Sequence, residues 1–101
     1  MGLKLYTPDL QCNADGRIWI RFTLSVENPV EFQIYAVGGT LVRTLECGTL
    51  AMGDYTSRQK AVLWDRKNES AEVVLSGIYT LYGYEDGVLS GQGAMLLNSS
   101  S

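Results

Sequence analysis

Apolar and polar residues alternate along several short stretches of this chain, most clearly over residues 17–25. Successive side chains of a strand point to opposite sides, so this alternation predicts a strand with one apolar face. That face consists of Ile18, Ile20, Phe22 and Leu24. A second alternating run covers residues 30–37 and ends at Gly38-Gly39, whose glycines supply the positive φ angles of a tight hairpin. Residues 41–45 form its returning strand, which Cys47-Gly48 ends.

Short apolar runs between turn residues continue along the rest of the chain. The expected order is an edge strand at 3–6, a turn at Gly53-Asp54, an interrupted strand at 55–64, a polar loop at 65–72, a long strand at 73–84, a turn at 85–87 and a last strand at 88–97. Gly77 lies within an apolar run, which predicts a bulge or a close approach of another backbone. About seven strands at roughly ten-residue spacing predict an antiparallel immunoglobulin-like β-sandwich, all-β, filling one domain over residues 1–101.

Composition agrees with a β-sheet protein and argues against two classes of partner. The 101 residues include eleven glycines and six tyrosines, which suit a chain with many tight turns. A net charge of −3 and eight scattered basic residues exclude a nucleic-acid footprint and an anionic membrane surface. No apolar run is long enough for membrane insertion, and no signal-peptide pattern is present, so any export signal lies outside this chain.

Candidate chemistry is sparse. The chain contains no histidine, the commonest general base and metal ligand, and its serines and cysteines have no base at a defined spacing, so we expect no enzyme. Most carboxylates lie beside turns, and no glutamate is plainly on a core face. Cys12 and Cys47 permit one disulfide or two free thiols. Ca²⁺ is the one candidate cofactor, and the simpler interpretation of its candidate ligands is that they lie in solvated turns. These ligands are the side-chain oxygens of Asn13, Asp15, Asp65, Asn68, Glu69 and Glu72.

Six segments occur in an order that matches a known family. They are Ile20-Arg21-Phe22-Thr23-Leu24, the run from Val30 through Ile34-Tyr35 and Gly39 to Leu41-Val42-Arg43-Thr44-Leu45, Gly53, Trp64-Asp65, Ser76-Gly77-Ile78-Tyr79, and Ala94-Met95-Leu96-Leu97. Together they resemble the immunoglobulin-like domain of the flagellar hook-capping protein FlgD and the related carboxy-terminal (type A) sorting domains of type IX secretion cargo. The resemblance covers nearly the whole chain. It implies the sandwich fold and a non-catalytic sorting, anchoring or scaffolding role, extracellular or at the bacterial cell surface.

One loop departs from the family pattern. The family reads Trp-Asp-Gly-x-Asp-x-x-Gly, whereas Arg66, Asn68 and Ala71 stand here in place of the two glycines and the second aspartate. With Asp65 and Glu69, the altered loop is a candidate site for a partner of this chain alone. We expect Trp64 and Tyr79 to anchor the core, and Gly39 and Gly77 to have structural roles in the backbone.

Aromatic residues supply the second candidate site. Trp19, Tyr35, Tyr82 and Tyr84 fall on strand faces that point outward, with Arg21 beside them. Large exposed rings suggest a partner, although both faces of a strand in a two-sheet sandwich can also be covered by simple packing. The partner is a protein or parent polypeptide in the leading interpretation. The alternatives are a glycan stacked on the aromatic face, as in a carbohydrate-binding module, and a homo-oligomer paired through edge strands.

Overall fold

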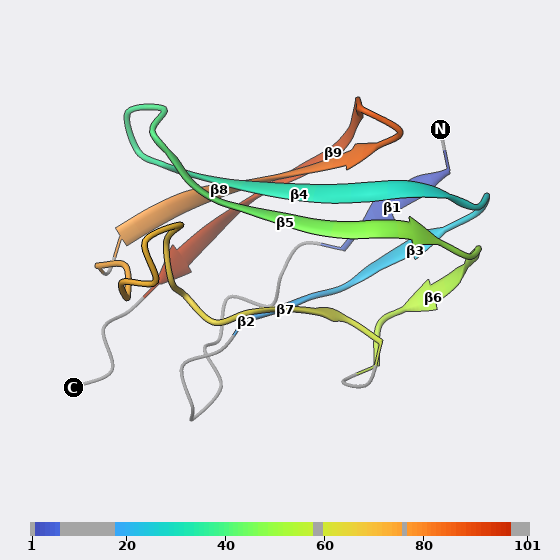
Figure 1. The fold of residues 1–101 in the computed structure, drawn as a ribbon, viewed down its shortest axis with the longest axis horizontal. Helices are drawn as coiled ribbons and strands as arrows, with labels where there is room; N and C mark the ends of the chain where they lie inside the picture. The colour runs from blue at the N-terminus through green and yellow to red at the C-terminus, as the bar shows by residue number, and fades with distance from the viewer. Residues whose placement is uncertain (1, 7–17, 58–59, 76, 98–101) are drawn as a thin grey trace.

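The structure, a computed structural model, describes residues 2–6, 18–57, 60–75 and 77–97. Nine strands and no helix occur within these ranges (Figure 1). The strands are β1 (Leu3–Leu5), β2 (Ile18–Ile20), β3 (Phe22–Leu24), β4 (Asn28–Ala36), β5 (Leu41–Leu50), β6 (Gly53–Tyr55), β7 (Val62–Trp64), β8 (Gly77–Glu85) and β9 (Val88–Leu97). None of the described residues forms a helix long and apolar enough to cross a membrane.

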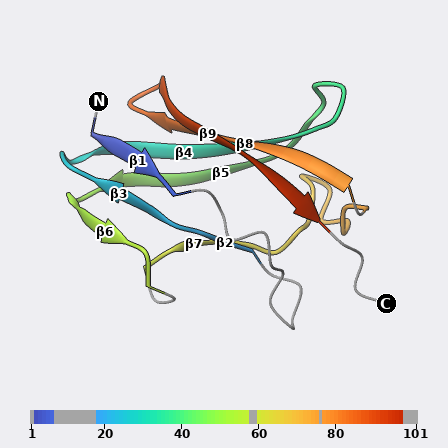
Figure 2. The same cartoon turned by 180° about the vertical axis from the view of Figure 1, so that it is seen from behind.

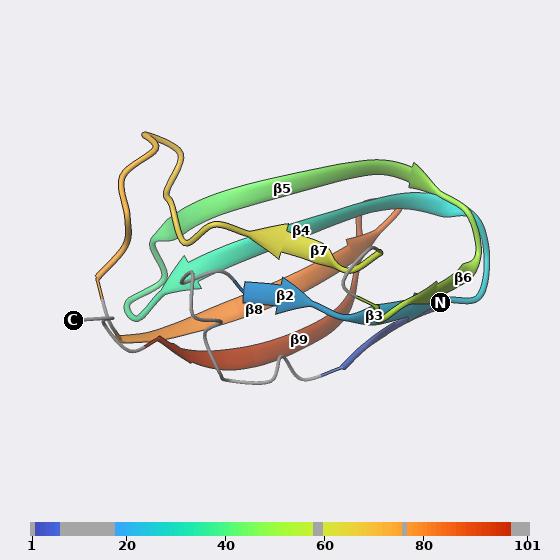
Figure 3. The ribbon, with the colours of Figure 1, turned by 90° about the horizontal axis from the view of Figure 1, so that it is seen from below.

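The strands form two layers, seen edge-on in Figure 1, from behind in Figure 2 and face-on in Figure 3. One layer is a four-stranded sheet in the order β5-β4-β8-β9, and the other contains β1-β3-β6 and β2-β7, with every pairing antiparallel. Only Arg21 separates β2 from β3, so these two strands continue one another in a single line. Their partners β7 and β6 form a second line beside them, and β1 is the third. The second layer therefore has three strand lines, which with the four-stranded sheet confirms the predicted antiparallel β-sandwich.

The core fills the space between the layers. Phe22 lies edge-on to Phe32, with ring centroids 5.1 Å apart, and stacks on Tyr55 at 4.8 Å. The alternating run at 17–25 buries its apolar face as predicted. Fully buried apolar side chains come from both layers: Ile20, Phe22, Phe32, Ile34, Trp64 and Leu81. Burying one such side chain contributes about 1.5–3 kcal/mol, so the core is the main source of stability.

Some predicted boundaries are wrong because glycines that read as strand ends lie within strands. The strand at 41–45 does not end at Cys47-Gly48 but continues to Leu50, since Gly48 (φ 71°) belongs to a bulge opposite the Val30/Glu31 step. Gly53-Asp54 is not a turn but the start of β6, which pairs with β3. The predicted interruption of 55–64 is confirmed, because β6 and β7 are separate strands.

The long strand predicted over 73–84 is also shorter than expected. β8 begins at Gly77, and Val73 makes only an isolated bridge to Lys67. Gly77 has φ 155°, a conformation rare for other residues, and space around its missing side chain, so backbone angle rather than close approach explains it. The register shift between β8 and β9 lies instead at the Gly83/Tyr84 step, where β9 has one extra residue, Ser90. The hairpin turn that follows is confirmed, with Asp86 and Gly87 both at positive φ.

Glu85 is fully buried, which corrects the expectation that no glutamate lies on a core face. It was assigned to the turn, yet it is the last residue of β8 and continues the inward alternation of Tyr79 and Leu81. Its carboxylate accepts hydrogen bonds from Leu3 N at 2.8 Å and Asn28 Nδ2 at 2.7 Å. A buried carboxylate is tolerated when it is hydrogen-bonded, and here it ties β1 to the four-stranded sheet.

Candidate partner-binding face

Three tyrosines project from the outer face of the four-stranded sheet. The pleat that turns alternate side chains of β4 and β8 toward the core leaves Tyr35, Tyr82 and Tyr84 half-buried on the opposite side. Tyr35 and Tyr82 meet edge to face, with centroids 5.4 Å apart and planes at 82°. This pair is a favourable aromatic contact but not a flat platform.

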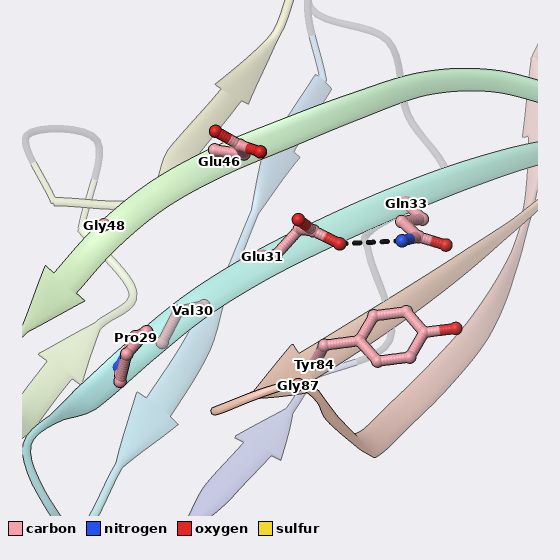
Figure 4. A pocket seen from close by; sticks show the side chains of 8 residues that line it. All are labelled: Pro29, Val30, Glu31, Gln33, Glu46, Gly48, Tyr84 and Gly87. Carbon is pink, nitrogen blue, oxygen red and sulfur yellow. Dashed lines mark hydrogen bonds between the residues drawn. The ribbon is translucent and has the colours of Figure 1, made fainter.

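Polar residues of β4 form a hydrogen-bond chain along the same face. The Tyr35 hydroxyl donates to Gln33 Oε1 at 2.9 Å, and Gln33 Nε2 donates to Glu31 Oε2 at 2.7 Å (Figure 4). Glu31 lies opposite Glu46 of β5 on one side and opposite Tyr84 of β8 on the other. The chain therefore fixes a carboxylate beside a tyrosine ring, with a second carboxylate on the next strand.

Two hollows open on this face, and Tyr84 lines both. The acidic hollow has a volume of about 430 Å³ and is drawn in Figure 4; its lining residues are Pro29, Val30, Glu31, Gln33, Glu46, Gly48, Tyr84 and Gly87. The tyrosine hollow has a volume of about 440 Å³ and lies toward the β4–β5 turn; its lining residues are Tyr35, Ala36, Val37, Gly38, Gly39, Thr80, Tyr82 and Tyr84. Concave sites with aromatic walls and a few placed polar groups are the usual form of a binding site.

The structure does not bring all five predicted face residues together. Trp19 pairs with Leu63 of β7, so it and Arg21 belong to the other layer, whereas the three tyrosines belong to the four-stranded sheet. The residues of both groups alternate along the chain with residues that face the core, so alternation correctly predicted that their side chains point away from it. Alternation carries no information on which sheet a strand joins, and a platform built from both groups does not exist.

The loop at 65–72 uses its polar groups internally. Asp65 Oδ1 accepts from Lys67 N at 3.0 Å, and Asn68 Oδ1 accepts from Ser70 N and Glu72 N at 2.9 and 3.0 Å. Such bonds from Asx side chains to nearby backbone stabilise turns. Arg66 is buried, with 5% of its surface exposed. The site predicted at Asp65, Arg66, Asn68 and Glu69 therefore stays a prediction, and the observed contacts of these residues stabilise the loop.

The same loop covers part of an edge of the four-stranded sheet. Glu69 N donates to Val42 O at 3.1 Å, and Glu69 Oε1 accepts from Thr44 N at 2.6 Å. Arg43 Nη1 donates to Asn68 O at 3.1 Å, which holds the loop against β5. Unpaired strand edges invite pairing with other chains, and Glu69 occupies this edge at Val42–Thr44.

The residues named as structural anchors occupy structural positions. Trp64 is fully buried, donates from Nε1 to Lys67 O at 3.1 Å and meets Tyr79 edge to face at 6.1 Å. Tyr79 donates its hydroxyl to Leu75 O at 2.7 Å. Gly39, at φ 91°, forms the β4–β5 turn, with its N–H donating to Ala36 O. The contacts of Trp64 and Tyr79 fasten both ends of the 65–75 segment to the core.

The predicted disulfide and the predicted calcium site each involve residues outside the described ranges. Cys47 has a free thiol in the structure, and Cys12 lies outside the described residues, so the Cys12–Cys47 disulfide stays a prediction. Burial, together with the charge of Glu31, raises the pKa of the Cys47 thiol to about 11. Among the described residues no three of the acidic or cysteine side chains gather as a metal site, and Asn13 and Asp15 lie outside them. Calcium binding stays a prediction.

Fold and face together define a β-sandwich module with an acidic and aromatic surface. A solved structure with the same fold is FlgD from P. aeruginosa, which aligns with a TM-score of 0.64 and 20% sequence identity, over 95% of this chain and 68% of that chain. This likeness shows the fold that the resemblance implied. No family model and no curated protein matches the chain.

Proposed function

We propose that this chain is a non-catalytic interaction or scaffolding module of an extracellular or cell-surface bacterial protein. The observation that carries the proposal is the FlgD-like sandwich, in which one sheet has two neighbouring hollows on its outer face. Long, continuously paired strands hold that face rigid, as a docking surface requires. The partner is a protein or the parent polypeptide.

The finer proposal is a terminal sorting or anchoring role like that of type IX secretion cargo. It is supported by the order of family segments, and by the 65–72 loop, which keeps positive φ angles at Arg66 and Ala71 although both family glycines are replaced. Positive φ is the region that glycine adopts most readily, so this loop has a glycine-type backbone at both positions without the glycines.

An export assay tests this role. A fluorescent reporter with a signal peptide at its amino end and this chain at its carboxyl end is expressed in a bacterium with a type IX system, and in a mutant without it. We expect the reporter at the surface or in the medium of the first strain alone. The same reporter without the chain is the control, and retention of the full fusion in the periplasm of both strains would refute sorting.

A glycan is the second candidate partner, and its proposed site is the tyrosine hollow. Tyr82 and Tyr84 line the tyrosine hollow, and sugar rings pack on such side chains. Binding to an oligosaccharide panel that is lost in Tyr82→Ala would support it. The third alternative, pairing through edge strands, has less support at Val42–Thr44, where Glu69 covers the edge.

A further inference from the structure

The acidic hollow presents negative charge and an aromatic ring in one row across three strands. Glu46, Glu31 and Tyr84 are successive cross-strand neighbours on β5, β4 and β8. Like charges directly opposite each other destabilise a sheet. Within the described ranges neither carboxylate forms an ion pair, and no lysine or arginine lines the hollow. A cation placed between them would remove this repulsion.

The geometry of the hollow is fixed before any ligand arrives. Gln33 Nε2 donates a hydrogen bond to one oxygen of Glu31 at 2.7 Å (Figure 4). The Tyr35 hydroxyl holds Gln33 in turn, so the orientation of the Glu31 carboxylate is fixed. The second Glu31 oxygen and the exposed Glu46 carboxylate stay available as acceptors. A preorganised site loses less conformational entropy on binding.

The walls suit a long side chain carried by an approaching backbone. Gly48 and Gly87 line the hollow and have open space where a side chain would stand, so a partner strand can come close there. Exposed Pro29 offers an apolar surface for an aliphatic stem. The hollow's volume of about 430 Å³ leaves room for such a group.

We propose that the acidic hollow binds an arginine side chain from a basic segment of the partner protein. A guanidinium carries donors only, pairs with carboxylates through two parallel bonds and stacks on an aromatic face, which matches Glu31, Glu46 and Tyr84. A sugar hydroxyl supplies no positive charge to relieve the carboxylate pair. The inference names the partner chemistry of the proposed interaction module and therefore rests on that proposed function.

Peptide titration tests the site. The probe is a fluorescent peptide of alternating glycine and arginine, compared with the same peptide carrying citrulline, a neutral analogue of arginine, and with neutral oligosaccharides. We expect only the arginine peptide to bind. Its affinity should fall with added salt, and its binding should shift the side-chain amide signal of Gln33 in NMR spectra. Equal binding of arginine and citrulline peptides, or binding of an oligosaccharide that displaces the arginine peptide, would overturn the proposal.

Matched variants locate the binding. Glu31→Gln, Glu46→Gln and Tyr84→Ala should each weaken the arginine peptide by about three- to fivefold, the size expected of one exposed ion pair or cation–π contact. Glu72→Gln makes the same charge change on the exposed 65–72 loop and should leave affinity unchanged. Equal losses in Glu31→Gln and Glu72→Gln would mean diffuse charge attraction and no site. Peptide binding without export would reject the sorting role alone, and export without peptide binding would reject the hollow alone.

Discussion

The two layers of the sandwich are built in different ways. In the four-stranded sheet β4, β5, β8 and β9 are nine or ten residues long, and each is paired along nearly its whole length. In the opposite layer all five strands have three residues each. Short ladders supply few hydrogen bonds, so the second layer depends on side chains that reach the first. The four-stranded sheet can carry a binding face because its long ladders hold the backbone of that face in place.

The layers also differ in the charge of their outer faces. The four-stranded sheet presents Glu31 and Glu46, whereas the other layer carries Lys4 and Arg21 together with one acidic residue, the exposed Asp54 of β6. Lys4 Nζ lies 5.5 Å from the centroid of the Tyr6 ring. A net charge of −3 alone does not reveal this separation. A basic partner would therefore be attracted more strongly to the four-stranded sheet than to the other layer.

The largest effect on this comparison is expected at Glu85, because it joins the layers. Glu85→Ala leaves the buried Leu3 N–H and the Asn28 amide without their acceptor and should lower the free energy of unfolding by about 3 kcal/mol. Urea unfolding measures the loss, and hydrogen exchange should show β1 opening before the four-stranded sheet.

Glu85→Gln separates the hydrogen bonds from the charge. Its amide oxygen can still accept from Leu3 N, and the Asn28 amide can turn its oxygen toward the new donor, so a loss of about 1 kcal/mol is expected. Glu27→Gln, in the exposed β3–β4 turn, is the control and should change little. Uniform loss of exchange protection in both layers would show that Glu85 does not hold β1 specifically.

The length of each unbroken alternating run explains what the sequence could predict. Alternation identified the core residues of 17–25 and of β4, because long inward-facing series leave a clear pattern. It did not find the strand at Gly53, because three residues are too few to show a period, and the sequence there reads as a turn. Glu85 was missed since a glutamate before Asp86-Gly87 looks like a turn residue; only its even spacing from Tyr79 and Leu81 indicated an inward position.

The candidate face was predicted in part for the same reason. The outward positions of Tyr35, Tyr82 and Tyr84 follow from alternation, but pairing between distant strands decides which outward residues become neighbours. Glu46 could not be placed, because the bulge beside Gly48 shifts the alternation of β5.

A smaller effect is expected at the edge of the four-stranded sheet. Glu69→Ala removes the acceptor for Thr44 N, which should cost about 1 kcal/mol in urea unfolding and expose the edge at β5. Light scattering should then show more self-association than in the parent chain. Glu72→Ala changes the same charge in the same loop and should do neither. Unchanged association in Glu69→Ala would mean that this bond does not protect the edge.

The smallest effect tests how the altered loop keeps its shape. Ala71 is exposed and has φ 64°, a left-handed conformation that costs a residue with a Cβ roughly 1–2 kcal/mol. Glycine removes this strain but adds roughly 0.4–1 kcal/mol of unfolded-state entropy, so Ala71→Gly should stabilise the chain by about 0.5 kcal/mol in urea unfolding. Ala51→Gly, in the β5–β6 connection where φ is negative, should destabilise it by about the entropic amount. If both variants lose stability equally, the loop does not adopt the left-handed turn. If Ala71→Gly alone increases the free energy of unfolding, the loop has a glycine-type backbone at a position without a glycine. The backbone that places Asn68 and Glu69 against β5 then does not depend on glycine at position 71.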